Sequence, residues 1–197
     1  MSKTSGKYDN VTVALHWIIG IGILSLAGLE LFRQEFPKGH FIREGLKALH
    51  QPTGTALFVL IMFRLAWRMT IAKAPAMPSA NGLSAIAAKI VHLALYALMI
   101  GLPLLGLLYV FGSNKVVEFG LFSLAMPLKE TIGGAAKSLR YWHETLGVAI
   151  LVLGLVHAAA ALMHHYVLKD GLLSRMRFSR SSGTNQRPPQ EPIYAAE

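Results

Sequence analysis

Eight histidines are the residues of this 197-residue chain with the clearest potential for chemistry. An imidazole can ligate a metal ion, and it can exchange a proton near neutral pH. The chain contains no cysteine, which excludes disulfides, thiolate zinc sites, iron–sulfur clusters and the C-x-x-C-H attachment of covalent haem. Any metal chemistry must therefore use histidine or carboxylate side chains.

The composition predicts that most of these histidines lie in a membrane. Hydrophobic residues make up 53% of the chain and charged residues 15%, and the mean hydropathy is +0.46. A helix needs about 20 apolar residues to cross a bilayer, and four stretches are long enough, at about 11–33, 46–69, 84–112 and 141–168. We expect an all-α, integral membrane four-helix bundle over residues 1–178, followed by a disordered polar tail over 179–197.

The distribution of charge predicts the orientation of this bundle. The net charge of +9 could indicate nucleic-acid binding, but basic stretches interleaved with aromatic residues are absent, so we expect no nucleic-acid partner. The two tails and the middle connection hold eleven basic and four acidic residues, whereas the other two connections hold eight and six. Basic residues gather on the cytoplasmic side of membrane proteins. Both termini are therefore predicted to be cytoplasmic.

The histidines within the spans fall at two depths. If the helices alternate in direction, His16 and His157 lie near the inner face, and His50 and His143 lie near the outer face. The fourteen residues from His143 to His157 make nearly four helical turns and about 21 Å of rise, so both side chains point from one face. Two histidine pairs at two depths predict two bis-histidine haems held across the bundle.

The residues four positions after these histidines are small and lie on the same helix face. They are Gly20, Gly54, Gly147 and Ala161. The other three histidines of the spans are followed at this spacing by bulky residues, namely Tyr96, Leu168 and Lys169. The small residues would leave room for a flat porphyrin, although small residues also mediate helix packing in membranes.

Four sequence stretches resemble the bacterial di-haem cytochrome b561 family of the inner membrane. They are VALHW at 13–17, LHQPTG at 49–54, YWHETLG at 141–147 and LVHAAAALMHHY at 155–166, and the similarity covers about residues 8 to 178. The resemblance implies that the four paired histidines are the axial ligands of two non-covalent b haems. It also implies a superoxide:ubiquinone oxidoreductase of the bacterial inner membrane, with periplasmic superoxide as electron donor and ubiquinone as acceptor.

Three residues are candidates for the quinone site. His164 lies seven residues after His157, almost on the same face and about 10 Å nearer the cytoplasm. A histidine there could hydrogen-bond a quinone carbonyl and deliver a proton. His92, at the inner end of the third helix, is the alternative, and Lys169 could lie beside either histidine.

Four basic residues have two possible roles each. Arg64 and Arg68 could pair with haem propionates at the inner depth, or they could end the second helix at the headgroups. Lys47 and Arg140 each lie one turn before an outer histidine. They could form a local basic focus for an anionic donor, or they could pair with propionates.

We therefore expect a membrane cytochrome that passes electrons from an outer to an inner haem and then to quinone, with lipid around it and no obligate protein partner. Two alternatives remain open. The chain could be the cytochrome b subunit of a hydrogenase or formate dehydrogenase, whose donor would be an iron–sulfur cluster of a partner. It could also be a structural or transport bundle in which the histidines link helices, and such a protein would be colourless.

Overall fold

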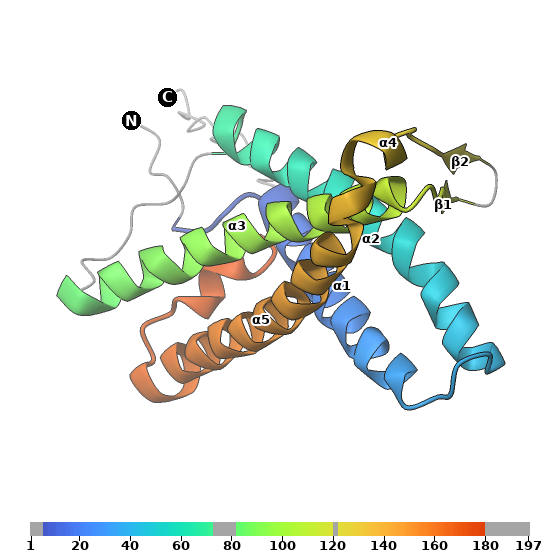
Figure 1. Cartoon of the computed structure of the whole chain (residues 1–197). Coiled ribbons are helices and arrows are strands. Elements are labelled where there is room, and N and C mark those ends of the chain that lie inside the picture. Colours follow the sequence, from blue (N-terminus) through green and yellow to red (C-terminus); the bar gives the residue numbers. More distant parts are fainter. Residues whose placement is uncertain (1–5, 73–81, 120–121, 180–197) are drawn as a thin grey trace, which may run out of the picture.

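The structure is a computed structural model that describes residues 6–72, 82–119 and 122–179. Four long helices dominate this part of the chain. These are α1 (Asn10–Gln34), α2 (Phe41–Thr70), α3 (Gly82–Gly112) and α5 (Ala136–Met163) (Figure 1). Between α3 and α5 lie the short strands β1 (Val117–Glu118) and β2 (Ser123–Leu124) and the helical turns α4 (Lys129–Ile132) and η1 (Gly133–Ala135). A π-helical turn, η2 (His164–Leu168), and a 3-10 turn, η3 (Leu173–Met176), follow α5. The prediction of an all-α membrane bundle is confirmed.

Three of these helical segments are apolar enough to cross a membrane, at Asn10–Gln34, Ser84–Gly112 and Lys129–Leu168 among the described residues. The second long helix, α2, is less apolar and begins at Phe41, before the expected start at residue 46. Its 30 residues span about 45 Å, which exceeds the hydrocarbon thickness of about 30 Å. The charged first turns of α2 can therefore lie outside the bilayer while the rest of the helix crosses it.

The helices pack in two close pairs. The most extensive contacts join α3 to α5 and α1 to α2, and smaller contacts between α2 and α3 and between α1 and α5 complete the bundle. Two glycines allow close approach: a Cβ on Gly22 would lie 2.7 Å from Leu57 Cδ2, and a Cβ on Gly154 would lie 3.3 Å from Leu24 Cδ2. These glycines bring α1 against α2 and α5 against α1.

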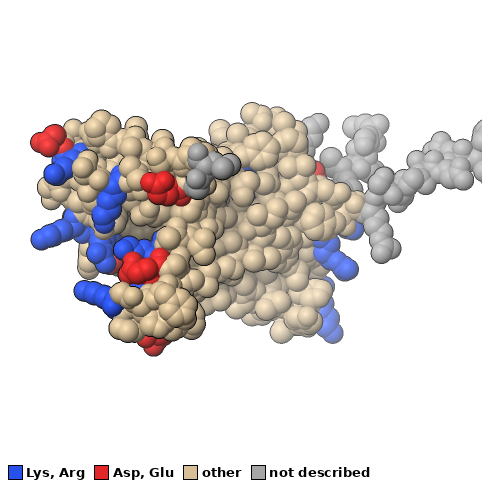
Figure 2. Space-filling model, turned by 90° about the vertical axis from the view of Figure 1, so that its right-hand side faces the viewer, with Lys and Arg blue, Asp and Glu red and all other residues tan. Residues whose placement is uncertain are grey.

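The outward faces of the helices are apolar. Figure 2 shows few charged side chains across the middle of the visible face, and Lys, Arg, Asp and Glu gather towards its two ends. Large apolar side chains such as Ile21, Leu93 and Val152 are exposed on these faces. This distribution suits a surface covered by lipid rather than water.

The two ends of the bundle are built differently. We call the end that carries the α1–α2 connection and the β1–β2 pair the outer end, and the opposite end the inner end (Figure 1). At the outer end β1 and β2 pair antiparallel, and Val117 is buried against Val110 and Phe111. The prediction that the inner end is cytoplasmic stays a prediction.

Hydrogen bonds between distant segments close the inner end. Asp9 caps α1 by accepting from the Thr12 backbone N–H at 2.9 Å and from Trp67 Nε1 at 3.2 Å. Burial alone would raise the pKa of Asp9, but these hydrogen bonds hold it below its ordinary value. Asn10 also exchanges two hydrogen bonds with the backbone of Ser179. Apart from Ser179, the predicted disordered tail lies outside the described residues.

Candidate metal centres and the outer cavity

The outer pair consists of His50 from α2 and His143 from α5. Their ring centroids are 6.0 Å apart, with 80° between the ring planes. An imidazole nitrogen lies about 2 Å from a bound metal ion, so two rings on opposite sides of one metal have centres roughly 6 Å apart. The Nδ1 atom of His143 lies 2.9 Å from the carbonyl oxygen of Leu102, to which it donates if the proton is on Nδ1. This hydrogen bond leaves Nε2 as the nitrogen for a metal.

The inner pair consists of His16 from α1 and His157 from α5. Their ring centroids are 6.3 Å apart, with 79° between the planes. His92 from α3 adds a third imidazole, because its ring centroid is 5.4 Å from that of His157. The structure therefore brings together the two histidine pairs named from the sequence, and it places His92 beside the inner pair.

A cavity of about 880 Å³ opens at the outer pair, lined among others by His50, His143, Gly54 and Gly147. Its volume is near the upper end of the range for ligand pockets, which is about 300–1,000 Å³. It is therefore large enough for a sizeable ligand beside the two imidazoles.

The glycines that follow the paired histidines face open space. A Cβ on Gly20 or Gly147 would meet nothing within 4 Å, and one on Gly54 would meet only Leu26 Cδ2, at 3.6 Å. Helix packing therefore does not account for these three glycines, in contrast to Gly22. Facing imidazoles at metal-bridging distance, with vacant space beside their helices, fit a flat macrocycle ligated by two histidines.

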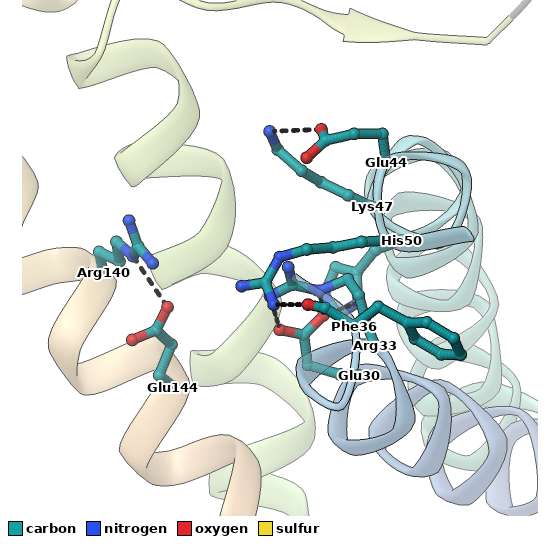
Figure 3. A network of polar contacts seen from close by, with 9 residues as sticks. Glu30, Arg33, Phe36, Glu44, Lys47, His50, Arg140 and Glu144 are labelled. Carbon is teal, nitrogen blue, oxygen red and sulfur yellow. Dashed lines mark hydrogen bonds and ion pairs between the residues drawn. The ribbon is translucent and has the colours of Figure 1, made fainter. Parts of the chain in front are cut away.

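Charged residues surround the outer cavity (Figure 3). Lys47 Nζ lies 3.3 Å from Glu44 Oε2, and Arg140 Nε lies 2.8 Å from Glu144 Oε1. Both predicted basic residues therefore line the cavity, but each is paired with a glutamate of its own helix. Among the described residues, the charged lining has six basic and three acidic members, which are Arg33, Lys38, Arg43, Lys47, Lys115 and Arg140, and Glu30, Glu44 and Glu144. The cavity is basic through the whole set rather than through two residues.

The two arginines of α2 occupy different environments. Arg64 is only 8% exposed, and its Nη1 donates to the Thr12 carbonyl oxygen at 2.8 Å. Arg68 lies further along the helix, with its guanidinium carbon 5.8 Å from the ring centre of Tyr8. α2 continues to Thr70, and Arg64 lies inside the bundle, where its side chain contacts α1.

The segment after α5 carries two of the three candidate quinone residues, His164 and Lys169. His164 Nδ1 lies 2.5 Å from Asp170 Oδ2, and Asp170 Oδ1 accepts from the Leu172 backbone N–H at 3.0 Å. Hydrogen bonds from the Leu172 N–H and from His164 hold the pKa of Asp170 below its ordinary value. The π-helical turn precedes Lys169, which adopts a left-handed backbone conformation with φ 52°. The α-helix α5 therefore ends at Met163, before the expected end at residue 168, and His164 lies in the π-helical turn.

Three residues of these sites were not predicted from the sequence. A Cβ on Gly106 of α3 would lie 2.9 Å from His143 Cε1, and no sequence signal marks this approach because it depends on how α3 meets α5. Glu30 lies fourteen residues after His16, and the same spacing separates His143 from His157. This spacing could have predicted that Glu30 lies on the histidine face of its helix, at the outer end. The partner of His164, Asp170, is the single acidic residue of a basic segment.

A membrane-embedded helical bundle that presents two facing histidine pairs is the arrangement expected of a membrane electron-transfer cytochrome. The chain belongs to the prokaryotic cytochrome b561 family, whose family model matches residues 7–179. It is 33% identical over 175 residues to the probable superoxide oxidase CybB of Yersinia pestis, covering 86% of this chain and 95% of that protein. It is also similar to cytochrome b561 homolog 2 of Escherichia coli (strain K12), at 28% identity over 184 residues, covering 92% of this chain and 96% of that protein. A b-type haem follows from the family.

Proposed function

We propose that this protein is a superoxide:quinone oxidoreductase of the bacterial inner membrane, with both termini cytoplasmic and two bis-histidine b haems. Two superoxide anions each give up one electron and become dioxygen. One ubiquinone takes up both electrons together with two protons and becomes ubiquinol. The observation that carries the proposal is the presence of two facing imidazole pairs, with ring centroids 6.0 and 6.3 Å apart.

The chain's own residues have distinct tasks in this proposal. His50 and His143 ligate one haem at the outer end, and His16 and His157 ligate the other at the inner end. When bound, the two haems supply one-electron redox chemistry. The Leu102 carbonyl orients His143, and Gly20, Gly54 and Gly147 leave space beside the ligands. The small side chain of Ala161 is proposed to do the same beside His157.

The outer cavity is suited to an anionic donor. Its basic residues outnumber its acidic ones, and a cleft with one dominant sign of charge raises the local concentration of the opposite ion. Lys47 and Arg140 contribute to this field and can also pair with propionates. The similarity to a probable superoxide oxidase supports superoxide as the anion.

The inner end is suited to quinone reduction. His164 carries an imidazole that can hydrogen-bond a quinone carbonyl and give up a proton, and Asp170 accepts a hydrogen bond from its other nitrogen. His92 and Lys169 are the further candidates for quinone contact. Arg64 and Arg68 are proposed to pair with propionates of the inner haem.

Haem content tests the proposal. The purified protein should contain two low-spin haems per chain. His50→Ala and His143→Ala should each lose the outer haem, and His16→Ala should lose the inner one. His40→Ala is the matched control and should keep both, because His40 caps α2 outside the two pairs. A colourless protein, or loss of the same haem from His16→Ala and His50→Ala, would overturn the pairing.

Superoxide generated enzymatically should reduce the haems of the purified protein, and added ubiquinone should reoxidise them. If superoxide fails to reduce a protein that contains both haems, the donor assignment is wrong. The cytochrome b subunit of a hydrogenase or formate dehydrogenase then becomes the better assignment, and such a subunit should purify with partner proteins.

A further inference from the structure

A carboxylate lies beside the outer ligand His50. Glu30, in the last turns of α1, has its Oε2 atom 3.9 Å from His50 Nδ1 (Figure 3). Because the carboxylate faces Nδ1, the opposite nitrogen of the ring, Nε2, is the one available for a metal. Glu30 also lines the outer cavity, so its charge acts on the same space that the two imidazoles face.

Arg33 fixes this carboxylate in place. Arg33 Nε donates to Glu30 Oε2 at 2.7 Å, and Arg33 Nη2 donates to Glu30 Oε1. The side chain of Arg33 is only 12% exposed and that of Glu30 28%, so water and salt screen their charges weakly. A bidentate pair of this kind holds both groups in one geometry. The outer site therefore has a fixed negative charge next to a ligand and a fixed positive charge just behind it.

The other outer ligand has a neutral partner. The Nδ1 atom of His143 is bonded to the Leu102 carbonyl oxygen, which carries no net charge. A carboxylate partner makes an imidazole a stronger electron donor than a carbonyl does, and partners of ligating histidines tune the metal. The two outer histidines thus differ in the group that faces Nδ1: a charged carboxylate for His50 and a neutral carbonyl for His143.

We propose that Glu30 positions His50 and that the opposed charges of Glu30 and Arg33 set the redox potential of the outer haem. This inference rests on the proposed function, because it takes His50 as an iron ligand. The carboxylate favours the oxidised state, which carries the more positive charge, and the guanidinium favours the reduced state. Removing one partner of the pair therefore shifts the potential in one direction, and removing the other shifts it in the opposite direction.

The test is a spectroelectrochemical titration of the purified full-length protein with both haems bound. In Glu30→Gln the outer haem should become easier to reduce, and in Arg33→Gln it should become harder to reduce, while the inner haem keeps its potential. We expect the equilibrium constant for outer reduction to change by up to about tenfold in each variant, which for one electron is about 59 mV. Glu144→Gln is the matched control, because Glu144 also lines the cavity but is 53% exposed. Its shift should be clearly smaller.

The outcomes separate this inference from the proposed function. The proposed role of Glu30 and Arg33 in setting the outer haem potential would be overturned by any of three results. These are shifts of the same sign in both variants, no shift in either variant, or a shift in Glu144→Gln as large as that in Glu30→Gln. If Glu30→Gln binds the outer haem too weakly to titrate, Glu30→Asp, which keeps the charge, should restore both binding and potential, and failure to do so counts against the inference. Retention of the outer haem by His50→Ala would instead refute the proposed ligand assignment.

Discussion

Alanine at position 106 should displace the imidazole of His143. The added Cβ would lie 2.9 Å from His143 Cε1, a distance that real Cβ atoms essentially never show, and 3.1 Å from His143 Nδ1. The ring cannot simply rotate away, because its Nδ1 is bonded to the carbonyl oxygen of Leu102 at 2.9 Å. We therefore expect Gly106→Ala to tilt the ring and to stretch or break this hydrogen bond.

The size of the effect follows from these contacts. Overpacking of a well-packed site costs about 1–3 kcal/mol, whereas replacing a helical glycine with alanine stabilises a helix by about 0.5–1 kcal/mol. The free energy of unfolding of the haem-free protein should therefore fall by no more than about 2.5 kcal/mol. Losing the partner of a ligating histidine weakens metal binding about 10- to 100-fold. Haem affinity at the outer site should thus change more than the stability of the protein.

The assay is the rate at which each haem passes from the purified protein to an excess of a haem-scavenging apoprotein. Gly101→Ala is the matched control, since it lies on the same helix and its added Cβ would meet nothing within 4 Å. The outer haem should leave Gly106→Ala about 10- to 100-fold faster than it leaves Gly101→Ala. The inner haem should leave both variants at the same rate. Equal outer rates in the two variants would refute the reasoning.

Three further predictions concern the cavity, the space for haem and the acceptor end. Reduction by superoxide should slow as ionic strength rises and slow further in Lys47→Gln and Arg140→Gln, with haem content intact, because a basic cleft can raise the association rate of an anion about tenfold or more. A rate independent of salt and of both substitutions would exclude electrostatic attraction of the donor by these residues. Gly147→Ala should lose the outer haem without destabilising the haem-free protein, because the new Cβ meets only open space; normal haem content would show that this space is not used. Asp170→Asn should keep both haems but slow reoxidation by ubiquinone, as His164→Ala should, because the carboxylate holds the His164 ring; unchanged reoxidation in both variants would place the quinone elsewhere.

Much of the architecture could be predicted from residue spacing. A helix has a fixed rise and a fixed number of residues per turn, so the fourteen residues from His143 to His157 determine both depth and face once the segment is helical. The same reasoning placed His16 and His50 at opposite ends, and the structure brings each to the expected partner on α5. The start of α2 was placed too late because hydropathy marks where the membrane begins, whereas the helix continues beyond it to Phe41.

The remaining features depend on distances between helices, which spacing along one helix does not contain. Gly106 matters only because α3 passes close to the His143 ring, and His92 joins the inner pair only because α3 packs against α5. The bond between His164 and Asp170 requires the chain to turn back after the π-helical turn. Local patterns predict which residues a helix presents, but tertiary packing decides which of them meet.

One spacing recurs in three of the four long helices and relates the two ends of the bundle. A chemically important residue at one end is followed fourteen residues later by another at the other end, in the pairs His16 and Glu30 on α1, His50 and Arg64 on α2, and His143 and His157 on α5. Each pair is separated by nearly four turns and about 21 Å, so its members share a helix face. Consequently α1 and α2 each supply a histidine to one end and a charged side chain to the other.

Under the proposed function, the signs of these two charges would favour electron flow from the outer to the inner end. The outer end receives the carboxylate of Glu30, 3.9 Å from His50 Nδ1, and a nearby negative charge favours the oxidised state of a metal centre. The inner end receives the buried guanidinium of Arg64, and a nearby positive charge favours the reduced state of a metal centre. Arg33 offsets part of the Glu30 charge at the outer end, whereas Arg64 donates a hydrogen bond to the uncharged Thr12 carbonyl oxygen. Under the proposed function, these two charges alone would favour the oxidised state at the outer end and the reduced state at the inner end, whereas the net positive charge of the outer cavity lining acts against the first of these effects.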